Sequence, residues 1–195
     1  GLKIKVQACH VNHCLRGEES EADMAFVKKL CDGLGVPCHM TRVNVARYAG
    51  ATGGSIQTAA RELRYLVFGR IFRRRSADRI ATAHTADDNA ETVLMNVIRG
   101  SGPAGLAGIP AARERRIVRP LLETEKGELL AWLARRGQGY RSDSTNVTGK
   151  YFRNRLRSDL IPALQEKYNP AIVRTICRTA EVMADVEDYL RTAAS

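Results

Sequence analysis

The stretch HTADDNAE at residues 84–91 gathers one histidine and three carboxylates at the start of a predicted helix. Glu91 follows Asp88 by three positions, so these two carboxylates share one helix face. Carboxylates in a first helical turn ordinarily interact with the helix dipole and its free N–H groups. Beside His84 and Asp87 they also suit chemistry, because hard oxygen ligands hold Mg²⁺ and carboxylates bind the ammonium of an amine. The stretch predicts a capped helix, or a site for a metal-bound nucleotide or an amine.

Two groups of arginines are the other candidates for chemistry. Arg61 and Arg64 lie three positions apart on a predicted long helix, and the run RNRLR contains Arg153, Arg155 and Arg157. A planar guanidinium can hold a phosphate through two parallel hydrogen bonds and can stack on a nucleobase. Both groups also fit a solvated surface, because an amphipathic helix needs a polar side.

The net positive charge of the chain indicates which kind of partner it could bind. The 195 residues carry 31 Lys and Arg against 21 Asp and Glu, a formal charge of +10, and 24 of the cations are arginines. A polyanion such as nucleic acid fits this charge. The charge by itself fits a merely basic surface equally well.

The composition predicts a protein without a membrane partner. Hydrophobic residues make up 44% of the chain, enough for one main domain with a small appended module. The longest apolar runs, such as LLAWLA at 129–134, are far shorter than the roughly 20 residues that cross a bilayer. The cysteines form no CxxC pair and no charged-then-apolar leader opens the chain, so we expect reduced thiols and a cytoplasmic location.

A cluster near residue 10 offers an alternative site. Cys9, His10, His13 and Cys14 are close enough in sequence to suggest a metal centre. Neighbouring residues of a strand point to opposite faces, however, so a sharp turn would have to gather these four ligands.

Alternating strands and helices must position these side chains. We expect strands at 2–12, 36–45, 77–84 and 115–122, and helices at 18–35, 55–75, 87–99, 124–137, 154–166 and 170–192. This alternation is typical of an α/β fold with a parallel sheet and flanking helices. We expect such a domain over residues 1–140, followed by an Arg-rich loop and a C-terminal helical extension over residues 141–195.

Six segments are similar to the tRNA(Ile)-lysidine synthetase family of the PP-loop ATPase superfamily: HVNHCLRGEES, AARELRY, HTADDNAETVLMNVIRGSGPAGLAG, IVRPLL, DSTN and YFRNRLRSDLIPALQEKYNP. They follow in the family's order and cover nearly all of the chain. The resemblance implies a PP-loop ATPase fold and a ligase that acts on tRNA(Ile) with a CAU anticodon. In that reaction C2 of the wobble cytidine is activated by adenylation, and L-lysine then displaces AMP to form lysidine. ATP and Mg²⁺ are the implied cofactors.

The resemblance also implies roles for individual residues. Asp88 and Glu91 would bind the ammonium of lysine, and one of them would accept its proton. Arg64 would stabilise the charge that builds on the α-phosphate and the departing pyrophosphate. No residue is assigned as a metal ligand. The remaining candidates are the nucleotide-binding residues His84, Asp87, Arg61 and Arg155 and the RNA-binding residues Arg153, Arg157 and Asn154.

The chain departs from the family's pattern in several places, among them Asn89 where the family has glutamine. The SGGxDS phosphate loop is absent from these residues. We expect the first strand and this loop to lie ahead of Gly1, so that this chain alone would lack the main contact to pyrophosphate. Cys14 stands where the family usually has glycine, and Thr85 where a second histidine is common.

Two alternative functions and one oligomeric state are also expected. A non-catalytic tRNA- or nucleotide-binding fragment is consistent with the absent phosphate loop. A tRNA thiolation protein of the same superfamily would transfer sulfur and typically uses a CxxC pair, which this sequence lacks. A homodimer is expected from analogy with the fold alone.

Overall fold

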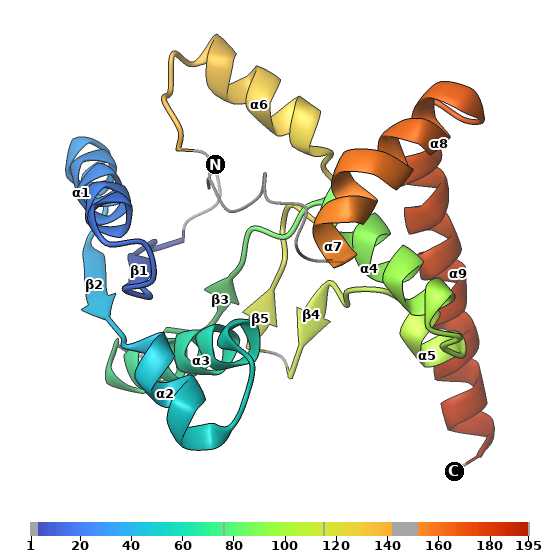
Figure 1. Cartoon of the computed structure of the whole chain (residues 1–195), viewed down its shortest axis with the longest axis horizontal. Helices are drawn as coiled ribbons and strands as arrows, with labels where there is room; N and C mark the ends of the chain where they lie inside the picture. The colour runs from blue at the N-terminus through green and yellow to red at the C-terminus, as the bar shows by residue number, and fades with distance from the viewer. Residues whose placement is uncertain (1–3, 76, 115, 142–151, 195) are drawn as a thin grey trace. The chain divides into compact units, whose positions relative to one another are not determined.

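The computed structural model describes residues 4–75, 77–114, 116–141 and 152–194. The chain forms two compact units, which meet in sequence at Asp78 and Arg79. Each unit contains a pair of parallel strands with flanking helices, which confirms the predicted α/β class (Figure 1). The predicted boundary between residues 140 and 141 lies within the second unit, beside residues outside the described ranges, and stays a prediction.

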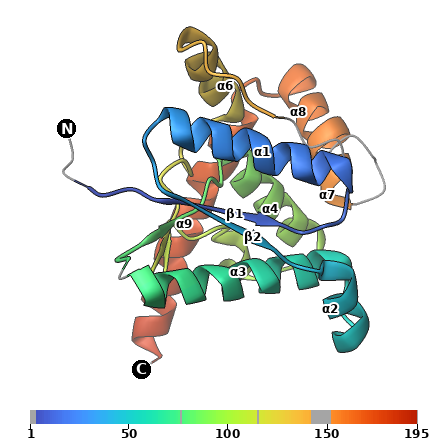
Figure 2. The same ribbon diagram turned by 90° about the vertical axis from the view of Figure 1, so that its left-hand side faces the viewer.

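In the first unit a two-stranded sheet lies between two layers of helices. Strand β1 (Ala8–Asn12) pairs in parallel with β2 (Cys38–Arg42). Helix α1 (Glu18–Gly33) covers one face, and α3 (Ile56–Arg75), with α2 (Val45–Thr52) packed against it, lies on the other (Figure 2). The chain leaves the carboxyl end of β1 and enters α1 at Glu18.

Local sequence signals explain where the helices of this unit begin and end. The Asn44 side chain accepts a hydrogen bond from the Arg47 amide at 2.9 Å and starts α2, which ends at Gly53 with a φ of 67°. Helix α1 ends before Gly35, whose φ of 64° is the left-handed conformation that glycine adopts without strain. Sequence analysis predicted α1 and α3 and missed α2.

The second unit is built on short strands and a helical core. Strand β3 (Ile80–Ala81) pairs in parallel with β5 (Ile117–Val118), and β4 (Ala112–Arg113) pairs antiparallel with β5. The predicted strands 77–84 and 115–122 are therefore too long. Pro120, two residues after β5, has no N–H to extend that strand, and α4 begins five residues after the end of β3. The helices are α4 (Ala86–Ile98), α5 (Pro103–Leu106), α6 (Lys126–Arg135), α7 (Phe152–Arg155), α8 (Ile161–Lys167) and α9 (Ile172–Ala193).

The core of this unit joins α4 to the C-terminal helices. Ala86 and Ala90 of α4 pack against Ile161 of α8 and Val173 of α9, and all four are buried. The predicted helix 154–166 is interrupted by a π-helical turn, η2 (Leu156–Leu160), in which the Ile161 amide donates to the Leu156 carbonyl. No described helix combines the length and apolarity that a bilayer crossing requires.

Candidate functional site

Helix α4 begins in a network of hydrogen bonds around Thr85. The Thr85 amide donates to Asp88 Oδ2 at 3.0 Å, and the Asp88 amide donates to Thr85 Oγ1 at 3.4 Å, which is a capping box. Asp87 Oδ2 accepts a hydrogen bond from the Lys126 amide, the first residue of α6, at 2.6 Å. Both aspartates therefore have the capping role that the sequence left open, and Asp87 caps a different helix from its own.

Glu91, one turn further along α4, is the centre of an ion-pair cluster. Its side chain is only 1% exposed, and Arg153 Nε donates to Oε2 at 2.5 Å while Arg157 Nε donates to Oε1 at 2.6 Å. The same two guanidinium groups lie 3.2 and 3.3 Å from Asp88 Oδ1. Two carboxylates and two guanidinium groups thus neutralise one another in what we call the α4 cluster (Asp88, Glu91, Arg153 and Arg157).

The carboxylates of the α4 cluster stabilise the charged form of Arg157. Burial opposes the charge of Arg157, but its hydrogen bond to Glu91 and the charges of Glu91, Asp88 and Asp87 outweigh that effect and raise its pKa. A guanidinium is already protonated at any ordinary pH. A cationic ligand of Asp88 or Glu91 would therefore have to compete with the guanidinium groups of Arg153 and Arg157.

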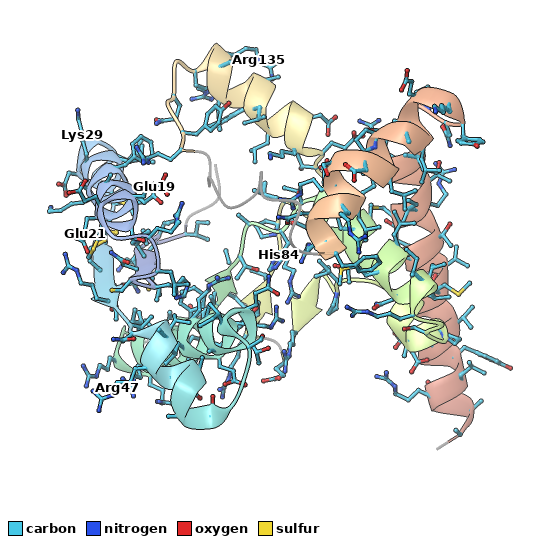
Figure 3. The ribbon with its side chains drawn as sticks, viewed as in Figure 1. Glu19, Glu21, Lys29, Arg47, His84 and Arg135 are labelled. Atoms are coloured by element: carbon cyan, nitrogen blue, oxygen red, sulfur yellow. The ribbon has the colours of Figure 1, made fainter. Side chains whose placement is uncertain are left out.

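The other predicted residues of the second unit lie outside these ion pairs. His84 follows β3, and its Nδ1 is 3.0 Å from Thr82 Oγ1 (Figure 3). The Arg155 guanidinium lies 5.6 Å from the ring centroid of Phe152, and the Asn154 carbonyl accepts a hydrogen bond from Ser158 Oγ. Sequence analysis grouped three arginines in RNRLR, and the structure separates them, since only Arg153 and Arg157 face the carboxylates.

Arg61 and Arg64 belong to the first unit, where both are exposed on α3. The Arg61 guanidinium lies 5.2 Å from the ring centroid of Tyr65. Arg64 Nη2 lies 3.4 Å from His13 Nε2, and a guanidinium has no acceptor, so Nε2 accepts and the imidazole proton sits on Nδ1. That Nδ1 is buried without a hydrogen-bond partner.

The electrostatics of His13 agree with a neutral imidazole. Burial, followed by the positive charge of Arg64 and the proximity of His10, lowers the pKa of His13 to about 4. Burial lowers the pKa of His10 as well, while Asp23 opposes that shift. His13 is therefore a neutral acceptor at neutral pH, and it orients Arg64 at the carboxyl end of β1.

Metal ligation gains no support from the described residues. Across residues 4–75, 77–114, 116–141 and 152–194, no group of three or more His, Cys, Asp or Glu side chains is placed to hold a metal ion. The alternative site at Cys9, His10, His13 and Cys14 is thus not assembled. Cys14 instead occupies the turn after β1 with a φ of 54°, a left-handed conformation that accounts for the glycine usual at this position in the resembling family.

Three residues of these sites were not predicted. Thr85 carries the capping box, and the T-x-x-D pattern before an apolar run was a signal that could have found it. His13 was considered only as a metal ligand, and its pairing with Arg64 has no signal in sequence. Arg119 follows β5, is only 6% exposed and keeps a buried Nε without a partner, which marks a buried cation that sequence analysis did not single out.

Comparison with known proteins identifies the chain's relatives. The PP-loop domain family matches residues 2–164. The tRNA(Ile)-lysidine synthase of Porphyromonas gingivalis (strain ATCC BAA-308 / W83) is 42% identical over 192 residues, which are 98% of this chain and 42% of that protein. The enzyme of the same name from Parabacteroides distasonis is 46% identical over 180 residues, covering 92% and 41%. The chain thus spans about two fifths of the length of these relatives.

A solved structure shares the fold. The U34-tRNA thiolase NcsA from Methanococcus maripaludis superimposes with a TM-score of 0.71 over 91% of this chain and 60% of the thiolase, at 19% sequence identity. At that identity the likeness concerns the fold alone. The tRNA(Ile)-lysidine synthase of Chlorobaculum tepidum, by contrast, is 39% identical over 97% of this chain and 57% of its own length.

Proposed function

The chain belongs to the PP-loop domain family, and on that basis we propose that it takes part in the ATP-dependent formation of lysidine at the wobble cytidine of tRNA(Ile). The observation that carries the proposal is the identity of 42% over 192 residues to a tRNA(Ile)-lysidine synthase. The six segments that resemble this family, including HVNHCLRGEES and HTADDNAETVLMNVIRGSGPAGLAG, support it. ATP as a substrate follows from the same membership.

The proposed reaction has two steps. In the first, the O2 atom of cytidine attacks the α-phosphorus of ATP, a P–O bond forms and pyrophosphate leaves. In the second, the amine of L-lysine attacks C2, a C–N bond forms, the C2–O bond breaks and AMP leaves with the electron pair. The nitrogen loses a proton, for which a carboxylate is the natural acceptor.

Asp88 is the better candidate of the two carboxylates for binding the lysine ammonium. Its side chain is 23% exposed, whereas that of Glu91 is 1% exposed. An ammonium that reaches Asp88 would exchange with the weaker contacts at 3.2 and 3.3 Å and leave the short bonds to Glu91 in place. We therefore propose that Asp88 contacts lysine and that Glu91 positions Arg153 and Arg157 beside it.

Arg64 is proposed to stabilise charge on the phosphates of ATP, oriented by neutral His13. Arg61, His84, Asp87 and Arg155 remain the proposed nucleotide-binding residues. Mg²⁺ fits the described side chains poorly, because Asp88 and Glu91 are paired with arginines and Asp87 caps α6, so no step is assigned to it. A cytoplasmic location and a homodimer also stay proposals, and the five cysteines are free thiols.

A chimera tests the proposal on this chain's own residues. These 195 residues replace the matched segment of the Porphyromonas gingivalis relative, and incorporation of radiolabelled lysine into a tRNA(Ile) transcript is measured with ATP. We expect incorporation, and Asp88→Asn should lower kcat/KM for lysine roughly tenfold or more, since a hydrogen bond to a charged group is lost. Asparagine keeps an oxygen for the Thr85 amide, so the cap survives.

A control variant and the nature of the transferred group decide the outcome. Asp159→Asn removes an exposed carboxylate from the same unit and should leave lysine incorporation unchanged. Equal loss in both variants would reject the role of Asp88. A chimera that folds and binds tRNA but transfers sulfur, or no lysine at all, would reject the function itself.

A further inference from the structure

Helix α6 carries an exposed tryptophan beneath an arginine. Trp132 is the one tryptophan of the chain, its residue surface is 46% exposed, and the Arg136 guanidinium lies 5.0 Å from its ring centroid. A large aromatic side chain is ordinarily found mostly buried, so this exposure calls for a physical reason. The cation–π contact holds the ring in place at a modest gain in free energy.

The surroundings of this ring are positively charged. Residues 129–142 contain Arg135, Arg136 and Arg141 and no acidic residue. The nearest carboxylate on the preceding turn, Glu128, is paired with Arg174 Nη2 at 2.8 Å. Figure 3 labels Arg135 near the end of α6, and the helix is tied to α4 and α9 at its first turn by the Asp87 and Arg174 contacts.

A second exposed ring follows the helix. Tyr140 is 58% exposed and lies between Arg136 and Arg141 in sequence. Aromatic rings interleaved with guanidinium groups suit unpaired nucleotides, because a base stacks on the ring while its phosphate pairs with the cation. An apolar protein partner fits less well, since it would bury the charges of Arg135 and Arg136 and supply no carboxylate to pair with them.

We propose that Trp132 and Arg136, flanked by Arg135 and Tyr140, form a stacking platform for an unpaired base of bound RNA. This inference rests on the proposed tRNA substrate and adds a contact surface to it. The α4 cluster strengthens the case, because Arg153 and Arg157 are engaged with carboxylates and offer little net charge to phosphate. Arg135 and Arg136 supply that charge on α6.

The single tryptophan makes the test direct. The 195-residue protein is titrated with an anticodon stem–loop RNA of tRNA(Ile) at low salt, and tryptophan emission is recorded together with the anisotropy of a labelled RNA. We expect the stem–loop to quench the emission as it binds. Inorganic polyphosphate, which has charge and no bases, should leave the emission unchanged even where it competes for the surface.

Substitutions separate stacking from charge. Trp132→Leu should weaken binding of the stem–loop roughly 5- to 150-fold, the range for removing one base–aromatic stack. Trp132→Phe should recover most of the lost affinity because it restores a flat ring. Tyr189→Leu is the control, since Tyr189 is a still more exposed aromatic residue, at 73%, but follows Glu187 and Asp188, and the substitution should leave binding of the stem–loop unchanged.

The outcomes distinguish this inference from the proposed function. A protein that binds the stem–loop with unchanged tryptophan emission, or with equal affinity in Trp132→Leu, has no stacking platform, while its role on tRNA stands. A protein that binds no stem–loop RNA at low salt overturns both. Loss of affinity in Tyr189→Leu as large as in Trp132→Leu would point to a protein-wide effect and reject the platform.

Discussion

At the scale of residues, the carboxylates near position 88 show what spacing can and cannot reveal. The pattern in HTADDNAE correctly placed Asp88 and Glu91 on one face of a helix that begins at Ala86. It could not reveal their partners, because Arg153 and Arg157 lie more than 60 positions away in sequence. Whether these carboxylates also bind lysine stays a prediction, and their ion pairs must be separated from that role experimentally.

Substitution of Glu91 should reveal its structural role. Glu91→Gln leaves two guanidinium groups without their main counter-charge. We expect the free energy of unfolding to fall by about 2–3 kcal/mol, at or below the low end of the range for breaking a buried ion pair, because Arg153 and Arg157 keep a third or more of their side-chain surface exposed. Urea denaturation followed by circular dichroism measures this change.

The control for Glu91 is a carboxylate in a surface pair. Glu187→Gln breaks the contact to Arg191 four positions along α9, at 3.1 Å, and should cost no more than about 0.5 kcal/mol. Similar losses in Glu187→Gln and Glu91→Gln would mean that the α4 cluster contributes little to stability.

His13 predicts a dependence of stability on pH. Its pKa is about 4 in the folded chain and 6.5 in a free side chain, so between these values the unfolded state binds more protons. The contribution of His13 to the free energy of unfolding is therefore fully present above about pH 6.5, and the free energy of unfolding falls as the pH drops towards 4. Denaturation midpoints between pH 7 and pH 4 should show this slope, and His13→Asn should flatten it. If the dependence of stability on pH were unchanged in that variant, other titratable groups, among them His10, would be its cause.

At the scale of elements, helices were predicted better than strands. Long amphipathic patterns located α1, α3, α4, α6 and α9 to within a few residues, because each has a start signal and a periodic apolar face. The strands are shorter in the structure than predicted, because an extended segment is part of a sheet only where it pairs with a neighbouring strand. The missed helix α2 has only eight residues, and its Asn44 cap and Gly53 stop were the available signals.

Gly108 predicts a local sensitivity in the loop after α5. Its φ is 67°, and a Cβ there would overlap Asn89 Oδ1, which accepts a hydrogen bond from the Ile109 amide at 2.8 Å. Gly108→Ala should therefore destabilise the chain by more than about 1 kcal/mol, through left-handed strain and loss of this bond. Thermal unfolding measures the change.

Gly127 provides the matched comparison. It lies in α6 with open space where a Cβ would be and without a positive φ. Gly127→Ala should stabilise the chain by roughly 0.5–1 kcal/mol, because alanine loses less backbone entropy in a helix. The two substitutions should therefore change the free energy of unfolding in opposite directions. A Gly108→Ala variant as stable as the unsubstituted chain would mean that the loop after α5 rearranges to accommodate the methyl group.

At the scale of the whole molecule, the charge of +10 predicts how RNA binding responds to salt. If three phosphates are neutralised, raising salt from 50 to 200 mM should weaken stem–loop binding roughly 20- to 40-fold through counterion release. Anisotropy titrations at several salt concentrations measure the slope. An oligonucleotide of the same sequence with an uncharged backbone should show almost no slope, and equal slopes would argue against phosphate contacts.

The π-helical turn has a consequence for how the second unit tolerates changes in chain length. Leu156 and Ile161 are both buried, at 3% and 7% exposure, although five positions in an α-helix would place them well apart around the axis. The extra residue in this turn lets Arg153 and Arg157 reach Glu91 while Ile161 still enters the apolar core. Deleting one residue would rotate the chain beyond the deletion by about 100° around the helix axis. The segment could then keep either the ion pairs to Glu91 or the burial of Ile161 in the apolar core, but not both. Insertions and deletions should therefore be far rarer between Arg153 and Ile161 than in the neighbouring connections.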